Sequence, residues 1–201
     1  MEEQYSKIPA DTFKQLGINA GMLLSDFDPS AGTYDDEDLL GPTTGGVRFT
    51  ATPEYIDYGE NVDNCPKNTM ELKRLDDWTV NMSGTFIAMT ATLAEKLSAL
   101  ADNTSGHIVP RSLLKTSDFG DIWLVGDYSD VNKSGTGTGA AKAGFIAIHL
   151  KNALSTGGFQ VQTADKDKMQ FAFEFTGHYS IDAQDEVPFE IYIKAGTPAS
   201  T

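Results

Sequence analysis

The sequence predicts a mainly β protein, an antiparallel β-sandwich or barrel with one flanking α-helix. Three observations lead to this fold class. Apolar and polar side chains alternate with a period of two along most of the chain, which is typical of strands with one buried face. One segment alone has the apolar spacing of an amphipathic helix. The chain has 201 residues, of which 40% are hydrophobic, and this suits one domain with a substantial core.

Four segments carry the alternation, at 46–52, 78–89, 168–177 and 187–194. The side chains that we expect on their buried faces are Val47, Phe49 and Ala51 in the first; Trp78, Val80, Met82, Phe86 and Ala88 in the second; Met169, Phe171, Phe173 and Phe175 in the third; and Val187, Phe189, Ile191 and Ile193 in the last. Two further segments, DIWLVGDYSD and GFIAIHLK, are apolar more continuously. We therefore expect both faces of these two strands to be covered.

The flanking helix is predicted over residues 92–102. Leu93, Leu97 and Leu100 follow one another at i, i+4 and i+7, which gives the segment an apolar stripe. Thr92 and Glu95 match a capping box, and this pattern favours a helix start at that point.

We expect a single domain over residues 1–201. Residues 1–45 are predicted to form an N-terminal arm and an acidic loop, and residues 46–196 the β-sandwich core. The segments 25–46 and 52–72 are too long for simple turns. We expect contacts with other subunits, in the same ring or in an adjoining one, to order both of them.

The stretch SGTGTGAAKAG at 134–144 has the residue types of a phosphate-binding loop. A P-loop needs Ser or Thr after its lysine, but Ala143 follows Lys142. The dinucleotide fingerprint needs a third glycine at the position that Lys142 occupies. A strand follows the run, whereas both motifs open a helix whose N-terminus binds the phosphate. We therefore predict that residues 129–143 are the Gly-rich tip of a hairpin.

Candidate catalytic and metal-binding side chains are scattered along the sequence. His107, His149 and His178 have none of the short spacings of a metal site. The single cysteine, Cys65, excludes an intrachain disulfide and a cysteine-based zinc site. A glycosidase-like carboxylate pair is a weak signal in a chain with 29 acidic residues. We predict no catalytic residue, no cofactor and no metal, and we expect that the protein is not an enzyme.

The formal net charge of -14 limits the kinds of partner that the chain can bind. Such a chain repels nucleic-acid phosphates, because binding them requires clustered Lys and Arg. Between Lys14 and Lys67 the acidic residues greatly outnumber the basic ones, with Arg48 as the lone cation. This excess of acidic residues has three possible explanations: solubility, calcium binding, or a negatively charged surface that faces a partner. We expect no signal peptide and no membrane span, because no sufficiently long apolar stretch exists.

Several segments together carry a resemblance to a known family. They include NAGMLLSDFDP, GPTTGGVRFTATPEYIDYGENVDNCPKNTMELKRLDDW, MSGTFIAMTA, GDYSD, GFIAIHLKNALSTGGFQVQ, FAFEFTGHYS and VPFEIYIKAG. These segments resemble the major tail tube protein of long-tailed, non-contractile bacteriophages. The resemblance runs through residues 16–196, and the insertion VNKSGTGTGAAKA departs from the family pattern.

The resemblance implies the phage tail-tube fold and a structural role without catalysis. Six subunits would form a ring, and the rings would stack into a helical tube. The tube would hold the tape-measure protein, meet tail terminator and tail tip proteins at its ends, and pass genomic DNA without specific binding. The expected location is the virion tail, assembled in the bacterial host cytoplasm. The alternatives are a tube subunit of a contractile injection or secretion machine, and a sugar-binding β-sandwich module.

A tube that conducts DNA should not bind it, because each neutralised phosphate adds an attraction. Polar side chains on the strand faces could therefore line the passage. The candidates are Thr79, Asn81, Ser83, Gln170 and Glu174.

Overall fold

The computed structural model describes residues 8–9, 12, 15–128 and 143–196. Every strand pairing is antiparallel, and one α-helix lies beside the sheets in this described part, which confirms the predicted fold class. The elements in chain order are β1 (Gly17–Leu24), η2 (Asp36–Asp38), β2 (Thr43–Asp57), η3 (Met70–Leu72), β3 (Lys73–Phe86), α1 (Ala91–Leu97), β4 (Ala101–Thr104), β5 (His107–Pro110), η4 (Thr116–Asp118), β6 (Gly120–Tyr128), β7 (Gly144–Ser155), β8 (Phe171–Thr176) and β9 (Phe189–Lys194).

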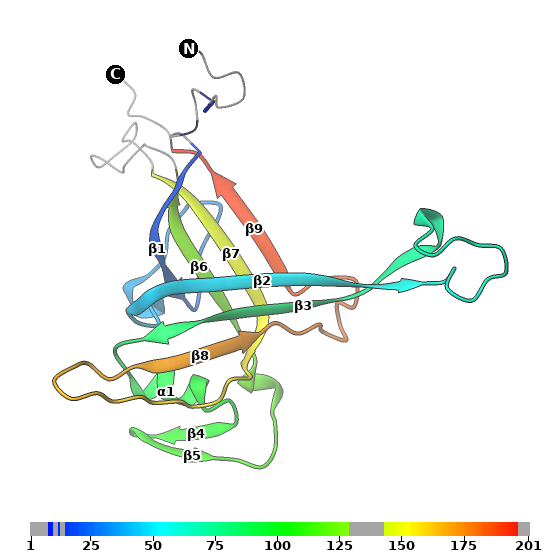
Figure 1. The fold of residues 1–201 in the computed structure, drawn as a ribbon. Helices are drawn as coiled ribbons and strands as arrows, with labels where there is room; N and C mark the ends of the chain where they lie inside the picture. The colour runs from blue at the N-terminus through cyan, green and yellow to red at the C-terminus, as the bar shows by residue number, and fades with distance from the viewer. Residues whose placement is uncertain (1–7, 10–11, 13–14, 129–142, 197–201) are drawn as a thin grey trace.

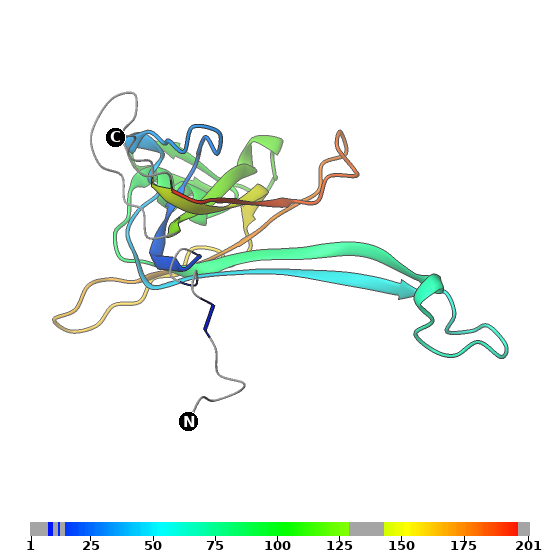
Figure 2. The ribbon, with the colours of Figure 1, turned by 90° about the horizontal axis from the view of Figure 1, so that it is seen from above.

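The large strands lie in two layers (Figures 1 and 2). The first layer has the strand order β1-β6-β7-β9, and the second layer has the order β2-β3-β8. The end of β7 joins the layers, because Leu154 and Ser155 pair with β8. Strands β4 and β5 form a separate two-stranded sheet next to α1 (Figure 1).

The main core fills the space between the two layers. The period-two pattern correctly predicted most of it, because alternate side chains of a strand point to one face. The buried members from β3 and β8 are Val80, Met82, Phe86, Phe171, Phe173 and Phe175. The pattern was wrong for Ala88, Met169, Ile191 and Ile193, which are exposed. The first two lie outside the strands, and the last two lie on a part of β9 that the second layer does not cover.

A smaller core covers the outer face of the first layer. It contains Leu24, Trp123 and Ala147, and Phe27 packs over them from the segment after β1. The Phe27 ring lies 5.7 Å from the Trp123 ring and 5.1 Å from the Phe145 ring, centroid to centroid. Strands β6 and β7 therefore have buried side chains on both faces, as their continuous apolar sequences predicted.

The predicted boundary of the N-terminal arm at residue 45 was wrong. Residues 17–24 form β1, which pairs with β6, and Leu23 and Leu24 are fully buried. The segment 25–42 packs back onto the domain through Phe27 and Leu40. These residues pack on the apolar cores of their own chain.

The helix is shorter than predicted and begins earlier. Thr90, not Thr92, is the N-cap, and its hydroxyl accepts a hydrogen bond from the Leu93 N–H at 3.1 Å. The helix ends at Leu97, because Ala99 adopts a left-handed backbone with φ of 59° and Ala101 begins β4. Leu93 and Leu97 are buried in the main core as predicted.

Strands β2 and β3 form a hairpin that extends far beyond the body of the domain (Figures 1 and 2). Sequence reasoning ended the first strand near residue 52 and predicted a long loop over 52–72. The ladder instead continues to the pair Asp57 and Lys73. A register shift after Pro53 interrupts the alternation of apolar and polar residues. The period-two pattern therefore did not identify the outer half of the hairpin as paired strands.

The Gly-rich run at 134–144 stands between two paired strands, as predicted. Tyr128 at the end of β6 pairs with Gly144 at the start of β7. Of the predicted tip at 129–143, residues 129–142 lie outside the described residues.

A methyl group at Gly144 is expected to be strongly destabilising. An added Cβ would lie 2.2 Å from the carbonyl oxygen of Tyr128 and 2.6 Å from the backbone nitrogen of Gly196. Gly144→Ala should therefore lower the free energy of unfolding by about 1–3 kcal/mol, as overpacking generally does. Gly17→Ala is the control, because no atom of the described residues lies within 4 Å of its added Cβ. Equal urea-unfolding midpoints for the two variants would contradict the prediction.

Candidate functional site

The outward surface of the second layer is a continuous polar face. Paired residues of neighbouring strands share a face, so the register defines its rows. One row runs from Arg48 through Ser83 to Glu174, and the next from Thr50 through Asn81 to Thr176. We call this surface the polar face; its side chains are Thr44, Arg48, Thr50, Thr52, Glu54, Thr79, Asn81, Ser83, Thr85, Glu174 and Thr176.

The alternate residues of the same strands explain why this surface is polar apart from Ala172. Phe49, Met82 and Phe175 pair in one row on the opposite side and belong to the main core. Burial of that side fixes the register, because a slip by one residue would turn the apolar set outward. The hydroxyl, amide and charged side chains therefore have to face away from the core.

Hydrogen bonds connect the strands across the polar face. The Thr176 hydroxyl donates to the Asn81 side-chain oxygen at 2.8 Å, and Thr156 and Thr176 share a bond of 2.8 Å. The Thr79 hydroxyl donates to the Glu54 carboxylate at 3.3 Å. These bonds satisfy part of the polar surface internally and leave short, mostly uncharged side chains toward the outside.

The structure brings together four of the five side chains that the sequence offered as lining candidates. Thr79, Asn81, Ser83 and Glu174 all belong to the polar face. Gln170 lies just before β8, where it pairs with Gln162 in an isolated bridge. Sequence reasoning missed the contribution of β2. In the sequence, Arg48, Thr50 and Thr52 alternate with apolar residues, which places them on one face of a strand. Only the pairing register shows that this face is continuous with the polar face of β3.

Three of the other candidate side chains make structural contacts, whereas His107 is exposed on β5. His149 stacks on Trp123 with ring centroids 3.9 Å apart, and its Nε2 lies 2.9 Å from an Asp121 carboxylate oxygen. His178 Nδ1 lies 3.1 Å from the Asn152 carbonyl oxygen. Cys65 lies near the hairpin tip with its Sγ 3.4 Å from the Thr69 hydroxyl. Within the described residues no group of three or more His, Cys, Asp or Glu side chains is arranged to hold a metal ion.

Glu174 on β8 and Glu190 on β9, two carboxylates of the strands, lie in different surroundings. Glu174 is exposed on the polar face. Glu190, on β9, accepts hydrogen bonds from Lys151 and Tyr192, and the bond from Lys151 lowers the pKa of Glu190 most strongly. A glycosidase needs a general acid whose pKa is raised. The direction at Glu190 is the opposite, so this carboxylate does not suit that role.

An ion pair beside α1 makes stability depend on pH. The guanidinium of Arg111 bonds the Asp118 carboxylate, and the Lys115 N–H donates to the same group at 2.8 Å. Arg111 first, and then this N–H, hold the pKa of Asp118 below its usual value of 3.8. The pair therefore stabilises the fold above pH 4, and this contribution is lost as the pH falls through the lowered pKa.

Asp118→Asn should remove that pH-dependent contribution. We expect the difference in unfolding free energy between the parent and the variant to be largest at pH 6 and to shrink toward pH 3. Urea unfolding of both proteins at the two pH values measures it. A difference that stays constant across this range would show that ionisation of Asp118 does not contribute.

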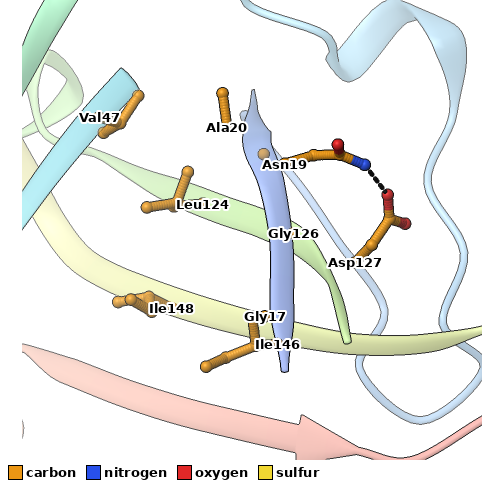
Figure 3. A pocket seen from close by; sticks show the side chains of 10 residues that line it. Gly17, Asn19, Ala20, Val47, Leu124, Gly126, Asp127, Ile146 and Ile148 are labelled. Atoms are coloured by element: carbon orange, nitrogen blue, oxygen red, sulfur yellow. Dashed lines mark hydrogen bonds between the residues drawn. The ribbon is translucent and has the colours of Figure 1, made fainter. Parts of the chain in front are cut away.

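A shallow groove lies on the inner face of the first layer, next to the start of β2. Its lining includes Val47, Leu124, Ile146 and Ile148, from β2, β6 and β7 (Figure 3). At one end the Asn19 amide donates to the Asp127 carboxylate at 2.7 Å (Figure 3). The groove combines an apolar wall with few polar groups, and it carries none of the catalytic candidates.

The comparisons with known proteins do not assign the chain to a family. No protein-family model matches it, and the search of curated proteins found no match. In the described part of the chain, no helix is both long and apolar enough to cross a membrane.

Proposed function

We propose that this chain is a structural virion protein that self-assembles into hexameric rings, which stack into the hollow tail tube of a long-tailed bacteriophage. The polar face is the observation that carries the proposal. In the ring it would line the channel, where the tape-measure protein lies during assembly and genomic DNA passes later. Tail terminator and tail tip proteins would close the two ends of the tube.

The composition of the polar face suits a surface along which DNA moves without stopping. Attraction to DNA comes mainly from Lys and Arg that neutralise phosphates. Arg48 is the cation of this face, and Glu174 lies in the same row two strands away. In a chain with net charge -14, such a face offers DNA little attraction.

The sheet edges support self-assembly. Strand β2 is an edge of the second layer, and β1 and β9 are the edges of the first layer among the described strands. An exposed edge offers unpaired N–H and C=O groups to another chain. Strand β2 presents such an edge over 15 residues, so closure into a ring would give these groups partners.

Electron microscopy of the concentrated, purified protein tests the proposal. We expect stacked rings with six-fold symmetry and a central channel. The same preparation would separate this function from a sugar-binding module, which would remain a dispersed monomer. A monomer at every concentration and salt condition would refute the tube function.

A further inference from the structure

The β2–β3 hairpin leaves the body of the domain at the point where β8 stops pairing with β3. The ladder between β3 and β8 ends at the pair Asn81 and Thr176. One more backbone bond follows, from the Gly177 N–H to the Val80 carbonyl oxygen at 3.0 Å. Further out, β2 and β3 continue as a two-stranded ribbon (Figures 1 and 2). Because a ribbon of two strands is only marginally stable by itself, its direction depends on how this junction is held.

A β-bulge interrupts the β2–β3 ladder at the same junction. The pairs on either side of the bulge are Pro53 with Trp78 and Tyr55 with Leu75. Glu54 therefore opposes two residues of β3, Asp76 and Asp77. A bulge of this kind bends the strand that contains it, and like charges on opposing residues weaken the pairing. The bulge is therefore a weak point of the ladder, at which the outer half of the hairpin can turn relative to the body.

Apolar packing between the hairpin and the first layer extends as far as this junction. The rings of Phe49 and Trp78 lie 5.7 Å and 5.4 Å from the ring of Phe189 on β9, centroid to centroid. On the far side of the bulge, the side chains of Tyr55 and Leu75 are 55% and 48% exposed. The apolar core therefore holds the inner half of the hairpin much more firmly than the outer half.

A tyrosine from a distant segment bonds the backbone at this junction. The Trp78 N–H points to the same side of β3 as the Val80 carbonyl group, because alternate residues of a strand bond toward the same neighbour. Strand β8 has already ended there, and the hydroxyl oxygen of Tyr179 accepts the hydrogen bond from Trp78 at 3.0 Å. The Tyr179 side chain thus takes the place of the next backbone bond between β3 and β8.

The backbone that carries Tyr179 is fixed to the first layer. The side-chain amide of Asn152 donates to the His178 carbonyl oxygen at 3.0 Å, and the His178 N–H donates to the Lys151 carbonyl oxygen at 3.3 Å. Asn152 and Lys151 both belong to β7. Tyr179 therefore connects the junction of the hairpin, in the second layer, to a central strand of the first layer.

We propose that the outer half of the hairpin pivots as a unit at the bulge, and that the bond from the Trp78 N–H to the Tyr179 hydroxyl is a latch that sets its direction. Tyr179 is 41% exposed, so water can replace its hydroxyl at the Trp78 N–H. Opening this bond leaves the β2–β3 pairs intact, because it belongs to the other side of β3. The latch acts within a single chain, so it does not depend on self-assembly.

Tyr179→Phe tests the latch, because it removes the hydroxyl and keeps the ring. We expect the Trp78 amide to exchange its hydrogen roughly 2- to 10-fold faster, which corresponds to the net worth of one hydrogen bond. The ladder amides beyond the bulge should keep their exchange rates, since a pivot does not open them. Nuclear magnetic resonance of the unassembled full chain measures each amide. Tyr34→Phe is the matched control, because it removes a hydroxyl from a tyrosine that is 43% exposed in the segment after β1.

The direction of the hairpin is measured between two spin labels on the same unassembled chain. In a Cys65→Ser background, Met70→Cys and Glu174→Cys place the labels at the outer end of the hairpin and on β8, where both side chains are exposed. Double electron–electron resonance should give one narrow distance distribution without further changes. Adding Tyr179→Phe should broaden or displace this distribution, whereas adding Tyr34→Phe should leave it narrow.

Deletion of Asp77 tests the position of the pivot. It leaves one residue opposite Glu54, so the ladder of β2 and β3 becomes regular. In this background Tyr179→Phe should no longer broaden the distance distribution. A distribution that broadens as before would place the pivot outside the bulge and overturn the proposal.

Three results with Tyr179→Phe itself would also overturn it. An unchanged exchange rate at Trp78 would mean that the hydroxyl does not hold this N–H. Faster exchange with an unchanged distance distribution would mean that the bond does not set the direction of the hairpin. Faster exchange along the whole outer ladder would mean that the hairpin frays instead of pivoting. The tube function is tested separately by the electron microscopy described above, so the two proposals can fail independently.

Discussion

Phe86→Ala is expected to lower the free energy of unfolding by about 3–5 kcal/mol, the usual cost of removing a buried phenyl ring. Phe86 is fully buried at the end of β3, and its ring packs on Phe173 with centroids 4.5 Å apart. It therefore helps to hold β3 and β8 together under the polar face. Urea denaturation of the unassembled chain gives the free-energy difference.

The control for this prediction is Phe159→Ala. Phe159 lies in the loop between β7 and β8, where about half of its surface is exposed. Replacing it should cost clearly less than the loss at Phe86, because half of its surface is already in water and its ring meets the core only at Phe171, with centroids 6.2 Å apart. A loss at Phe86 as small as that at Phe159 would mean that the core rearranges freely around this site, and the packing described above would then be wrong.

Lysines introduced on the polar face are expected to turn the assembled tube into a DNA-binding tube. Thr50→Lys and Ser83→Lys place cations in neighbouring rows, and ring assembly would repeat them around the channel. With about six phosphate contacts, affinity should fall roughly 10³-fold between 50 and 200 mM salt. Fluorescence anisotropy of a short labelled duplex with assembled tubes measures this dependence.

Thr104→Lys is the matched variant for this experiment, because Thr104 is exposed on β4, away from the polar face. Tubes that carry this lysine should admit the duplex without retaining it. Equal retention by both kinds of tube would mean that the polar face is not the channel lining, even if the rings themselves form as proposed.

The core residues were predicted more accurately from the sequence than the boundaries of the strands and of the N-terminal arm. Alternation identified Val80, Met82 and Phe175, because a strand with one buried face has a strict period of two. It missed β1, where Asn19 and Gly21 have φ of 71° and 74° and the register with β6 shifts. Such an irregular strand has no regular alternation, so it was assigned to an arm.

The candidate surface was predicted residue by residue but not as a whole. Thr79, Asn81 and Ser83 were correctly placed on one face, since they alternate within a single strand. Their alignment with Thr50 and Thr176 depends on pairings between segments far apart in the chain. No local pattern contains that information. The exposure of Ile193 was missed for a related reason, because alternation identifies an apolar face without indicating what covers it.

The pairing of Tyr128 with Gly144 has a practical consequence for this chain as a scaffold. The ladder of β6 and β7 holds Tyr128 and Gly144 side by side, so a longer connection between them is compatible with the same strand pairing. A flexible inserted peptide that doubled the length of this connection would add only about 0.6 kcal/mol of closure entropy. A foreign peptide spliced between these two residues would be carried once per subunit, and a regular array of it would follow wherever the subunits assemble.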